Sequence, residues 1–306
     1  MDSAKCRFKQ HFWPRVYCGA PHVHKHGGDS LMGRYFLYRM HPLSVAELLR
    51  TEFSEKLHSK PQRVDKQAFE QLLQFGGFPE PFLRSSKRFS NRWQRLRFDQ
   101  LFKEDMRELS KSIDVLRVQA LSEVVSKSAG QPVNMSTLSN LIDVSVDTIR
   151  RWLGILELLH FSFAIRPWFK NVPKSIRLRQ KIYLWDWSLH KEAGTRNENF
   201  VASHLLKAVH WWTDIGLGDF GLFYLRDKLH REVDFLVTKN EEPWILIEVK
   251  SSSAKSVSKS LHYYHQKLEV PHAFQVAFDS PYVDVDCFAA TTPKIVPVST
   301  FLSQLV

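Results

Sequence analysis

The sequence predicts an α/β protein, in which a mainly helical middle region leads into a C-terminal domain with a mixed sheet. Three observations support this prediction. Residues 115–168 have the pattern of three helices and a strand, residues 231–250 alternate as two strands joined by a turn, and helical patterns near 197–211 and 256–268 flank those strands. Helices that flank a mixed sheet are typical of the α/β class.

The chain is long enough for two or three domains, because 306 residues can form more than one core. We expect four parts: a poorly ordered N-terminal segment, a mixed and helical region, a second helical module and an α/β domain. Their expected bounds are 1–26, 27–114, 115–170 and 171–306.

The composition is that of a soluble globular protein with a polyanionic partner. Hydrophobic residues make up 43% of the chain, and no run of about 18 apolar residues is present to span a bilayer. Residues 1–26 lack the features of a secretory signal, so we expect a cytoplasmic protein. Its three cysteines fit neither a zinc site nor a disulfide framework. The formal net charge of +11 favours nucleic acid over a membrane surface as the partner.

In the first third of the chain we expect a strand at 35–40, a short helix at 45–49 and a helix at 65–75. The stretch 82–114 is expected to be helical with one strongly positive face. Both a solvated helix face and contact with phosphates are consistent with this charge. The residues that carry it are Arg84, Lys87, Arg88, Arg92, Arg95 and Arg97.

Residues 115–168 have the order of a winged helix, with helices near 115–129, 136–142 and 146–159. The third helix would place Arg150 and Arg151 outward, where they could lead into a major groove. The alternative is that this module only packs between neighbouring domains.

A basic loop at 170–181 precedes a strand at 182–187, where we expect the last domain to start. We expect the loop to contact nucleic acid through Lys174, Arg177 and Arg179. The elements expected after this strand are a helix at 197–211, strands at 222–226, 231–237 and 244–250, a helix at 256–268 and a strand at 272–278.

The strands 231–237 and 244–250 carry the residues that point to chemistry. Alternation along the second strand puts Glu248 and Lys250 on one face, opposite an apolar set that takes the core. If Thr238 pairs with Trp244 across a five-residue loop, Asp234 lies directly opposite Glu248, whereas a slip of one residue would separate the two acids.

Directly opposed residues have β-carbons roughly 4.5–5.5 Å apart, so Asp234 and Glu248 could share a Mg²⁺ ion. Such a metal site would suit hydrolysis of a phosphodiester. Lys250 could orient water or neutralise charge on the phosphate, and Glu198 could add a carboxylate from the adjoining helix. The alternative is an exposed hairpin face with ordinary charged residues.

At these residues the sequence resembles the PD-(D/E)XK nuclease-like domains found at the C terminus of a large prokaryotic family of AAA-type ATPases of unknown function. The resemblance implies a restriction-endonuclease-like fold. It implies that Asp234 and Glu248 are metal ligands, Lys250 the catalytic lysine and Glu198 the helix acid. The likeness extends over Ser30–Tyr35, Pro42–Ser44, Gly76–Glu80, Val144–Leu159, Lys181–Asp186, Arg196–Asn199, Tyr224–Lys228, Glu232–Phe235 and Glu248–Lys250.

The sequence departs from that family in two places. Val233 precedes Asp234 where the family has proline, and no phosphate-binding loop of the Gly-x-x-x-x-Gly-Lys-Ser/Thr type is present. We therefore expect a shortened relative in which residues 27–114 hold a remnant of the ATPase domain and a helical region, without an ATP site and without ATPase activity of its own.

Three functions are compatible with these patterns. The first is a DNA-binding protein that cleaves phosphodiesters with Mg²⁺. The second is a non-catalytic nucleic-acid-binding or regulatory module. The third is a degenerate ATPase remnant that acts through a partner protein or a second copy of the chain.

Overall fold

The structure is a computed structural model, and it describes residues 36, 38–50, 52, 54–106, 114–168, 179–253 and 256–306. The chain divides into two units, residues 1–40 and 41–306. The four described residues of the first unit are not in a strand, although a strand was predicted at 35–40. No described strand pairs with them, and a strand needs such a partner. The poor order predicted for 1–26 lies outside the described residues.

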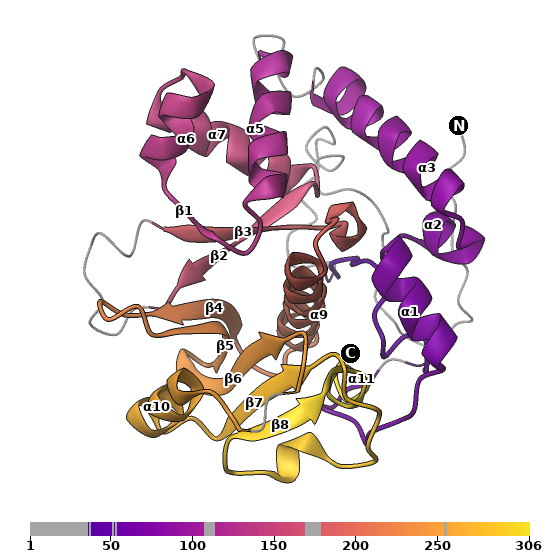
Figure 1. Cartoon of the computed structure of the whole chain (residues 1–306), viewed down its shortest axis with the longest axis vertical. Helices are drawn as coiled ribbons and strands as arrows, with labels where there is room; N and C mark the ends of the chain where they lie inside the picture. The colour runs from indigo at the N-terminus through magenta and orange to yellow at the C-terminus, as the bar shows by residue number, and fades with distance from the viewer. Residues whose placement is uncertain are drawn as a thin grey trace. The chain divides into compact units, whose positions relative to one another are not determined.

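Within 41–306, eight described strands form one mixed sheet in the order β1-β3-β2-β4-β5-β6-β7-β8 (Figure 1). Pairing is parallel between β2 and β4, β6 and β7, and β7 and β8, and antiparallel elsewhere. The prediction of a mixed α/β fold is confirmed. The strands are β1 Pro132–Val133, β2 Ser162–Pro167, β3 Gln180–Leu184, β4 Phe220–Arg226, β5 Glu232–Lys239, β6 Glu242–Lys250, β7 His272–Ala277 and β8 Lys294–Pro297.

The helices predicted at 65–75, 115–129, 136–142, 146–159, 197–211 and 256–268 agree with the observed ones to within four residues. The segment 45–49 forms a turn, and the described part of 82–114 is not one helix, because Ser85 adopts a left-handed conformation and ends α2 before α3 begins. Side-chain caps begin several of them. Ser145, for example, accepts a hydrogen bond from the backbone N–H of Thr148 at 3.1 Å. The α-helices are α1 Lys66–Phe75, α2 Pro79–Arg84, α3 Lys87–Gln100, α5 Val115–Lys127, α6 Met135–Ile142, α7 Val146–Leu158, α9 Ala193–Asp214, α10 Lys259–Leu268 and α11 Val298–Ser303; a π-helix η2 (Leu101–Asp105) and 3-10 helices η3 (Trp187–Leu189) and η4 (Cys287–Ala289) complete the set.

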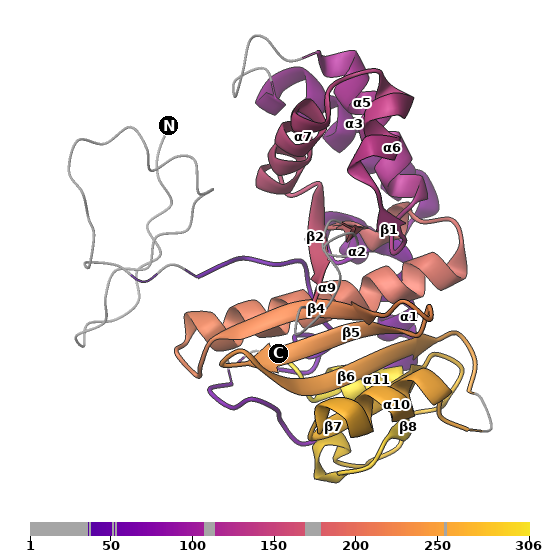
Figure 2. The ribbon, with the colours of Figure 1, turned by 90° about the vertical axis from the view of Figure 1, so that its left-hand side faces the viewer.

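Two layers of helix cover the two faces of the sheet, as Figure 2 shows for α9 and α10. Phe235 and Ile247 face the core that α9 closes, whereas Leu236 and Leu246 face the smaller core under α10. Successive residues of β5 and β6 therefore alternate between two buried faces. Asp234 and Glu248 follow directly after the last pair of these strands, Phe235 and Ile247, at the end away from the turn.

The helices α5, α6 and α7 form a third core with the end of α3. Trp152 and Leu156 of α7 are buried there. β3 also contributes to this core through Ile182 and Leu184, and it pairs with β1 and β2. The strand that was expected to start the last domain thus reaches β4 only through β2.

Candidate functional site

The turn between β5 and β6 differs from the predicted one. Thr238 pairs with Pro243, not with Trp244, and the connection is the two residues Asn240 and Glu241, both with positive φ. Two left-handed residues give a tight hairpin turn that matches the twist of the strands. The five-residue loop was therefore a wrong prediction.

A register shift next to this turn restores the predicted alignment. The shift lies between Val237 and Thr238, and beyond it Val237 pairs with Ile245 and Phe235 with Ile247. A bulge adds one residue to one strand and so offsets the shorter turn. Continued by one step, this register places Asp234 opposite Glu248.

The ladder of paired residues between β5 and β6 ends at Phe235 and Ile247, just before Asp234. The Asp234 Oδ2 accepts a hydrogen bond from the backbone N–H of Val249 at 2.9 Å. The Val249 N–H lies beyond the last paired residues of β5 and β6, and the Asp234 carboxylate is its acceptor. This bond holds the carboxylate against β6. The side chain remains 19% exposed.

Glu248 is held from two sides. Its Oε1 lies 2.7 Å from the Lys250 Nζ, and its Oε2 accepts a hydrogen bond from the Ser258 Oγ. Ser258 is also the N-cap of α10, where its Oγ accepts from the Leu261 N–H at 3.2 Å. The start of α10 therefore positions the Glu248 carboxylate, while Lys250 stays 45% exposed.

Lys181 does not lie in the exposed basic loop where the sequence analysis placed it. It was counted in the basic loop, yet its side chain is only 2% exposed. Its Nζ lies 3.2 Å from Glu198 Oε1, 2.8 Å from Glu232 Oε1 and 3.7 Å from Asp234 Oδ1. Glu198, Glu232, Asp234 and Glu248 are called the carboxylate cluster below.

Two neighbours complete the surroundings of Glu198. The Tyr183 hydroxyl donates to Glu198 Oε1 at 2.7 Å. Gly130 has φ +76°, and a β-carbon there would lie 3.0 Å from the same oxygen, so glycine suits this position for both backbone and space. Lys181 and Tyr183 are two residues apart in β3, a spacing that places both on one face of a strand. Because Lys181 shares its face of β3 with the buried Tyr183, the alternation along 180–184 is the sequence signal that could have shown Lys181 to be buried.

The charges of the cluster change each other's protonation. Burial, followed by the negative charge of Glu198, raises the pKa of Asp234 to about 7, although Lys181 and the Val249 N–H oppose the change. Burial alone would lower the pKa of Lys181, but attraction to Glu198, Asp234 and Glu232 outweighs it and raises that pKa. The pKa of Lys250 is likewise raised, because its bond to Glu248 outweighs the effect of burial. Both lysines are therefore cations at neutral pH.

Among the described residues, no group of three or more His, Cys, Asp or Glu side chains is arranged to hold a metal ion. Glu248 lies close enough to Asp234 to contribute to its raised pKa, and Glu198 and Asp234 both contact Lys181. Carboxylate oxygens suit magnesium, which is commonly held by one or two carboxylates with water and substrate phosphate. The donor chemistry therefore fits Mg²⁺, while Lys181 already supplies one positive charge.

The predicted nucleic-acid contacts fall into two groups. Lys174 and Arg177 lie outside the described residues, whereas Arg150, Arg151 and Arg179 are exposed. Arg150 pairs with Asp147 of its own helix at 2.8 Å.

Arg97 does not belong to the exposed positive face predicted for 82–114. Its guanidinium lies 3.9 Å from the centre of the Phe78 ring and donates to the His160 carbonyl. Arg97 therefore holds α3 in place, which explains why the predicted face was too wide.

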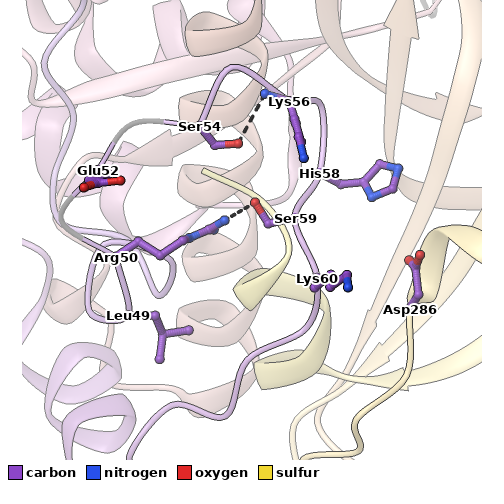
Figure 3. Close-up of a pocket in the computed structure, with 9 residues that line it drawn as sticks. All are labelled: Leu49, Arg50, Glu52, Ser54, Lys56, His58, Ser59, Lys60 and Asp286. Atoms are coloured by element: carbon purple, nitrogen blue, oxygen red, sulfur yellow. Dashed lines mark hydrogen bonds between the residues drawn. The ribbon is translucent and has the colours of Figure 1, made fainter.

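A pocket of about 560 Å³ lies away from the cluster and contains none of its residues (Figure 3). Arg50 at this pocket donates to the Ser59 Oγ and to the carbonyls of Ser303 and Leu305. These bonds tie the segment near residue 50 to the C-terminal helix. The pocket is lined by Leu49, Arg50, Glu52, Ser54, Lys56, His58, Ser59, Lys60 and Asp286.

Two families match the chain, and both are described as domains of unknown function. Residues 66–198 match DUF8612, and residues 193–285 match DUF4143. The chain is also similar to uncharacterized proteins of Mycobacterium bovis and Mycobacterium tuberculosis, each 24% identical over 241 residues, which is 76% of this chain and 51% of the relative. It thus spans about half the length of these curated relatives. No solved structure matches the chain.

The two matched regions meet at the carboxylate cluster. Lys181 lies in the first region, Glu198 in the overlap, and Asp234 and Glu248 in the second. The cluster is therefore built by both. None of the described helices has the length and apolar character needed to cross a bilayer.

Proposed function

We propose that the protein binds DNA and hydrolyses its phosphodiester bonds with Mg²⁺ at the carboxylate cluster. The observation that carries this proposal is the convergence of Asp234, Glu248 and Lys250 where the pairing of β5 and β6 ends. A restriction-endonuclease-like site of the PD-(D/E)XK type needs two acids and a lysine in this relation. The relationship to AAA-type ATPases suggested by the sequence is part of the same proposal.

Asp234 and Glu248 are the residues that would hold the ion. Mg²⁺, when bound, would offset their charge and lower the pKa of a coordinated water. The protein's own part is to fix the two carboxylates, Asp234 through the Val249 N–H and Glu248 through Ser258. Preorganised groups of this kind need no rearrangement during the reaction.

Lys250 would act on the substrate as a cation. Its raised pKa keeps the ammonium protonated at neutral pH, so it is suited to stabilise charge and not to accept a proton. Because the side chain is 45% exposed, a phosphate oxygen could reach the Nζ without displacing the core. Its bond to Glu248 directs it toward the acid pair.

The helical module supports DNA binding. Helices α5, α6 and α7, followed by the paired strands β2 and β3, have the order of a winged helix. In such a module α7 would face the major groove, and its exposed Arg151 would contact phosphates there. The net charge of +11 adds long-range attraction to DNA.

A second candidate is a non-catalytic nucleic-acid-binding module, and Lys181 favours it. The ammonium of Lys181 contacts three carboxylates, so the cluster has a counter-charge of its own without any metal. In that case the acids and Lys181 would hold the two matched regions together, and the basic surface alone would bind nucleic acid.

Cleavage of supercoiled plasmid in Mg²⁺ separates the two candidates. The comparison is between the parent, Lys250→Ala and the control Lys259→Ala, which changes an exposed lysine at the start of α10. Loss of the Lys250 charge should slow cutting about 100-fold or more. The Lys259 variant should cut like the parent.

Two results would count against catalysis at this site. If the parent binds the plasmid in Mg²⁺ without cutting it, the non-catalytic candidate stands. If the parent and Lys250→Ala cut equally, the cutting activity does not come from the carboxylate cluster.

A further inference from the structure

We propose that the exposed face of α3 lies along the phosphate backbone of duplex DNA and is the main source of sequence-independent affinity. This inference rests on the proposed DNA binding and assigns it to a surface other than α7. The surface is called the α3 arginine face and consists of Arg88, Arg92 and Arg95, with Lys87 at its edge. Figure 1 shows α3 along the outside of the described fold.

The opposite side of α3 is anchored in the protein. Ser90 is buried, Trp93 packs against the Phe78 ring, and Phe98 packs against Phe102 of the third core. Arg97 lies over Phe78 and donates to the His160 carbonyl at 3.2 Å. The helix is therefore fixed on one side, so its outward face is held as a rigid row.

The outward face of α3 carries positive charge that no described acidic residue compensates. Arg88, Arg92 and Arg95 lie within about 60° of one another around the helix, because each residue turns it by about 100°. All three are exposed, and no described residue forms an ion pair with them. No acidic residue occurs between Glu80 and Asp99. Asp99, the first acid after them, is paired with Lys103 at 3.1 Å.

Several other arginines of the described chain are neutralised by neighbouring acids. Arg117 pairs with Asp114 and Asp143, Arg226 with Glu232, and Arg231 with Asp227. Like charges three or four residues apart disfavour a helix. Arg88 and Arg92, and Arg92 and Arg95, have these spacings. A polyanion bound along α3 would relieve that repulsion.

The dimensions of the row suit a nucleic-acid backbone. The seven steps from Arg88 to Arg95 rise by roughly 10 Å along the helix, and phosphates of one DNA strand follow each other at about 3.4 Å along the duplex axis, so the row covers about three phosphate steps measured along that axis. Guanidinium groups bind phosphate oxygens in pairs and are well suited to this contact. Contacts to phosphates alone carry no sequence information, so the expected binding is non-specific.

A membrane surface fits the same face less well. A helix that binds a bilayer inserts an apolar side, but the apolar side of α3 is occupied by contacts with Phe78 and the third core. Leu96 is the large apolar residue that α3 leaves exposed, at 53%. The face therefore matches a hydrated polyanion.

Binding to a 25-base-pair duplex in EDTA tests the proposal, because it needs neither metal nor catalysis. The variants are Arg88→Gln/Arg92→Gln/Arg95→Gln on α3 and Arg150→Gln/Arg151→Gln on α7. The control, Arg63→Gln/Lys66→Gln/Lys127→Gln, removes the same charge from exposed positions elsewhere. Fluorescence anisotropy is measured as a function of salt, and thermal unfolding is compared for all variants.

We expect the α3 variant to bind at least tenfold more weakly, with a log–log salt slope shallower by about 2.7, or about 0.9 for each lost phosphate contact. The control should behave like the parent. Unchanged binding by the α3 variant, a loss only in the α7 variant or an equal loss in the control would overturn the proposal while the DNA-binding function stands.

Failure of the parent to bind DNA would overturn both proposals. Vesicles that contain anionic phospholipid are the remaining probe. Binding of the parent to these vesicles that is lost in the α3 variant, without an effect on DNA binding, would assign the face to a membrane instead.

Discussion

The carboxylate cluster and the α3 arginine face place charged residues together in opposite ways. In the cluster, Lys181 contacts three carboxylates, and its side chain is 2% exposed. On α3, three arginines are exposed and none of the described acids neutralises them. A buried charge needs a partner within the protein, whereas a solvated charge is stabilised by water and remains available to bind another molecule. Substitutions in the cluster should therefore change folding stability, and those on α3 should change association.

The largest effect is expected for Lys181→Met, which keeps most of the side-chain volume and removes the charge. It leaves Glu198, Glu232 and Asp234 without their shared counter-ion, so the free energy of unfolding at pH 7 should fall by about 3–5 kcal/mol. Urea denaturation measures the change. Lys250→Met is the control, because Lys250 is 45% exposed and should lose much less.

The same variant should also respond to pH. Lowering the pH from 7 to 5 protonates Asp234, whose charged form Lys181 no longer stabilises, so Lys181→Met should regain part of its lost stability. If its stability equals that of the parent at pH 7, the contrast between cluster and α3 fails, because the buried charges would then need no internal partner.

The next largest effect is expected for Asp234→Asn, which should raise the free energy of unfolding at neutral pH instead of lowering it. The pKa of Asp234 is raised to about 7 from an ordinary value of 3.8, so the folded state binds more protons than the unfolded state between these values. The contribution of Asp234 to stability is thus greatest below pH 4 and is lost as the pH rises through 7. The loss is at most about 4 kcal/mol.

Asparagine carries no charge and can still accept from the Val249 N–H. Asp234→Asn should therefore unfold like the parent near pH 4 and be more stable than the parent above pH 7. Urea denaturation between pH 4 and 8 tests this crossing. A variant that is less stable than the parent at pH 8 would mean that ionised Asp234 is stabilised by Lys181 and the Val249 N–H more than it is destabilised by burial and by Glu198.

The contrast also explains what the sequence predicts and what it does not. Alternation along 231–250 predicts the hairpin and the faces of its residues, because these depend on neighbours in the chain. The tight turn at Asn240 and Glu241 was missed, since a short turn with a bulge gives the same alignment as a longer loop. The alignment at the cluster was therefore predicted more reliably than the turn itself.

Burial of single charges was the part that the sequence did not predict. Lys181 follows a basic loop, and Arg97 follows a row of arginines, so each was assigned to a positive surface. Lys181 is buried and Arg97 is half-buried, and each contacts partners from other elements: Glu232 for Lys181, and Phe78 and His160 for Arg97. The composition of a segment reports its charge, whereas burial depends on tertiary contacts.

The smallest effect is expected for the stability of Arg88→Gln/Arg92→Gln/Arg95→Gln. Glutamine and arginine have similar helix propensities, so only the repulsion between the arginines changes, by about 0.2–0.5 kcal/mol per pair. The variant should be slightly more stable than the parent at 10 mM salt and equal to it at about 1 M, where charges are screened beyond about 3 Å. Urea denaturation at the two salt concentrations measures this difference. A loss of more than about 1 kcal/mol would exceed what exposed positions contribute and would mean that these arginines are held by the fold, as Arg97 is.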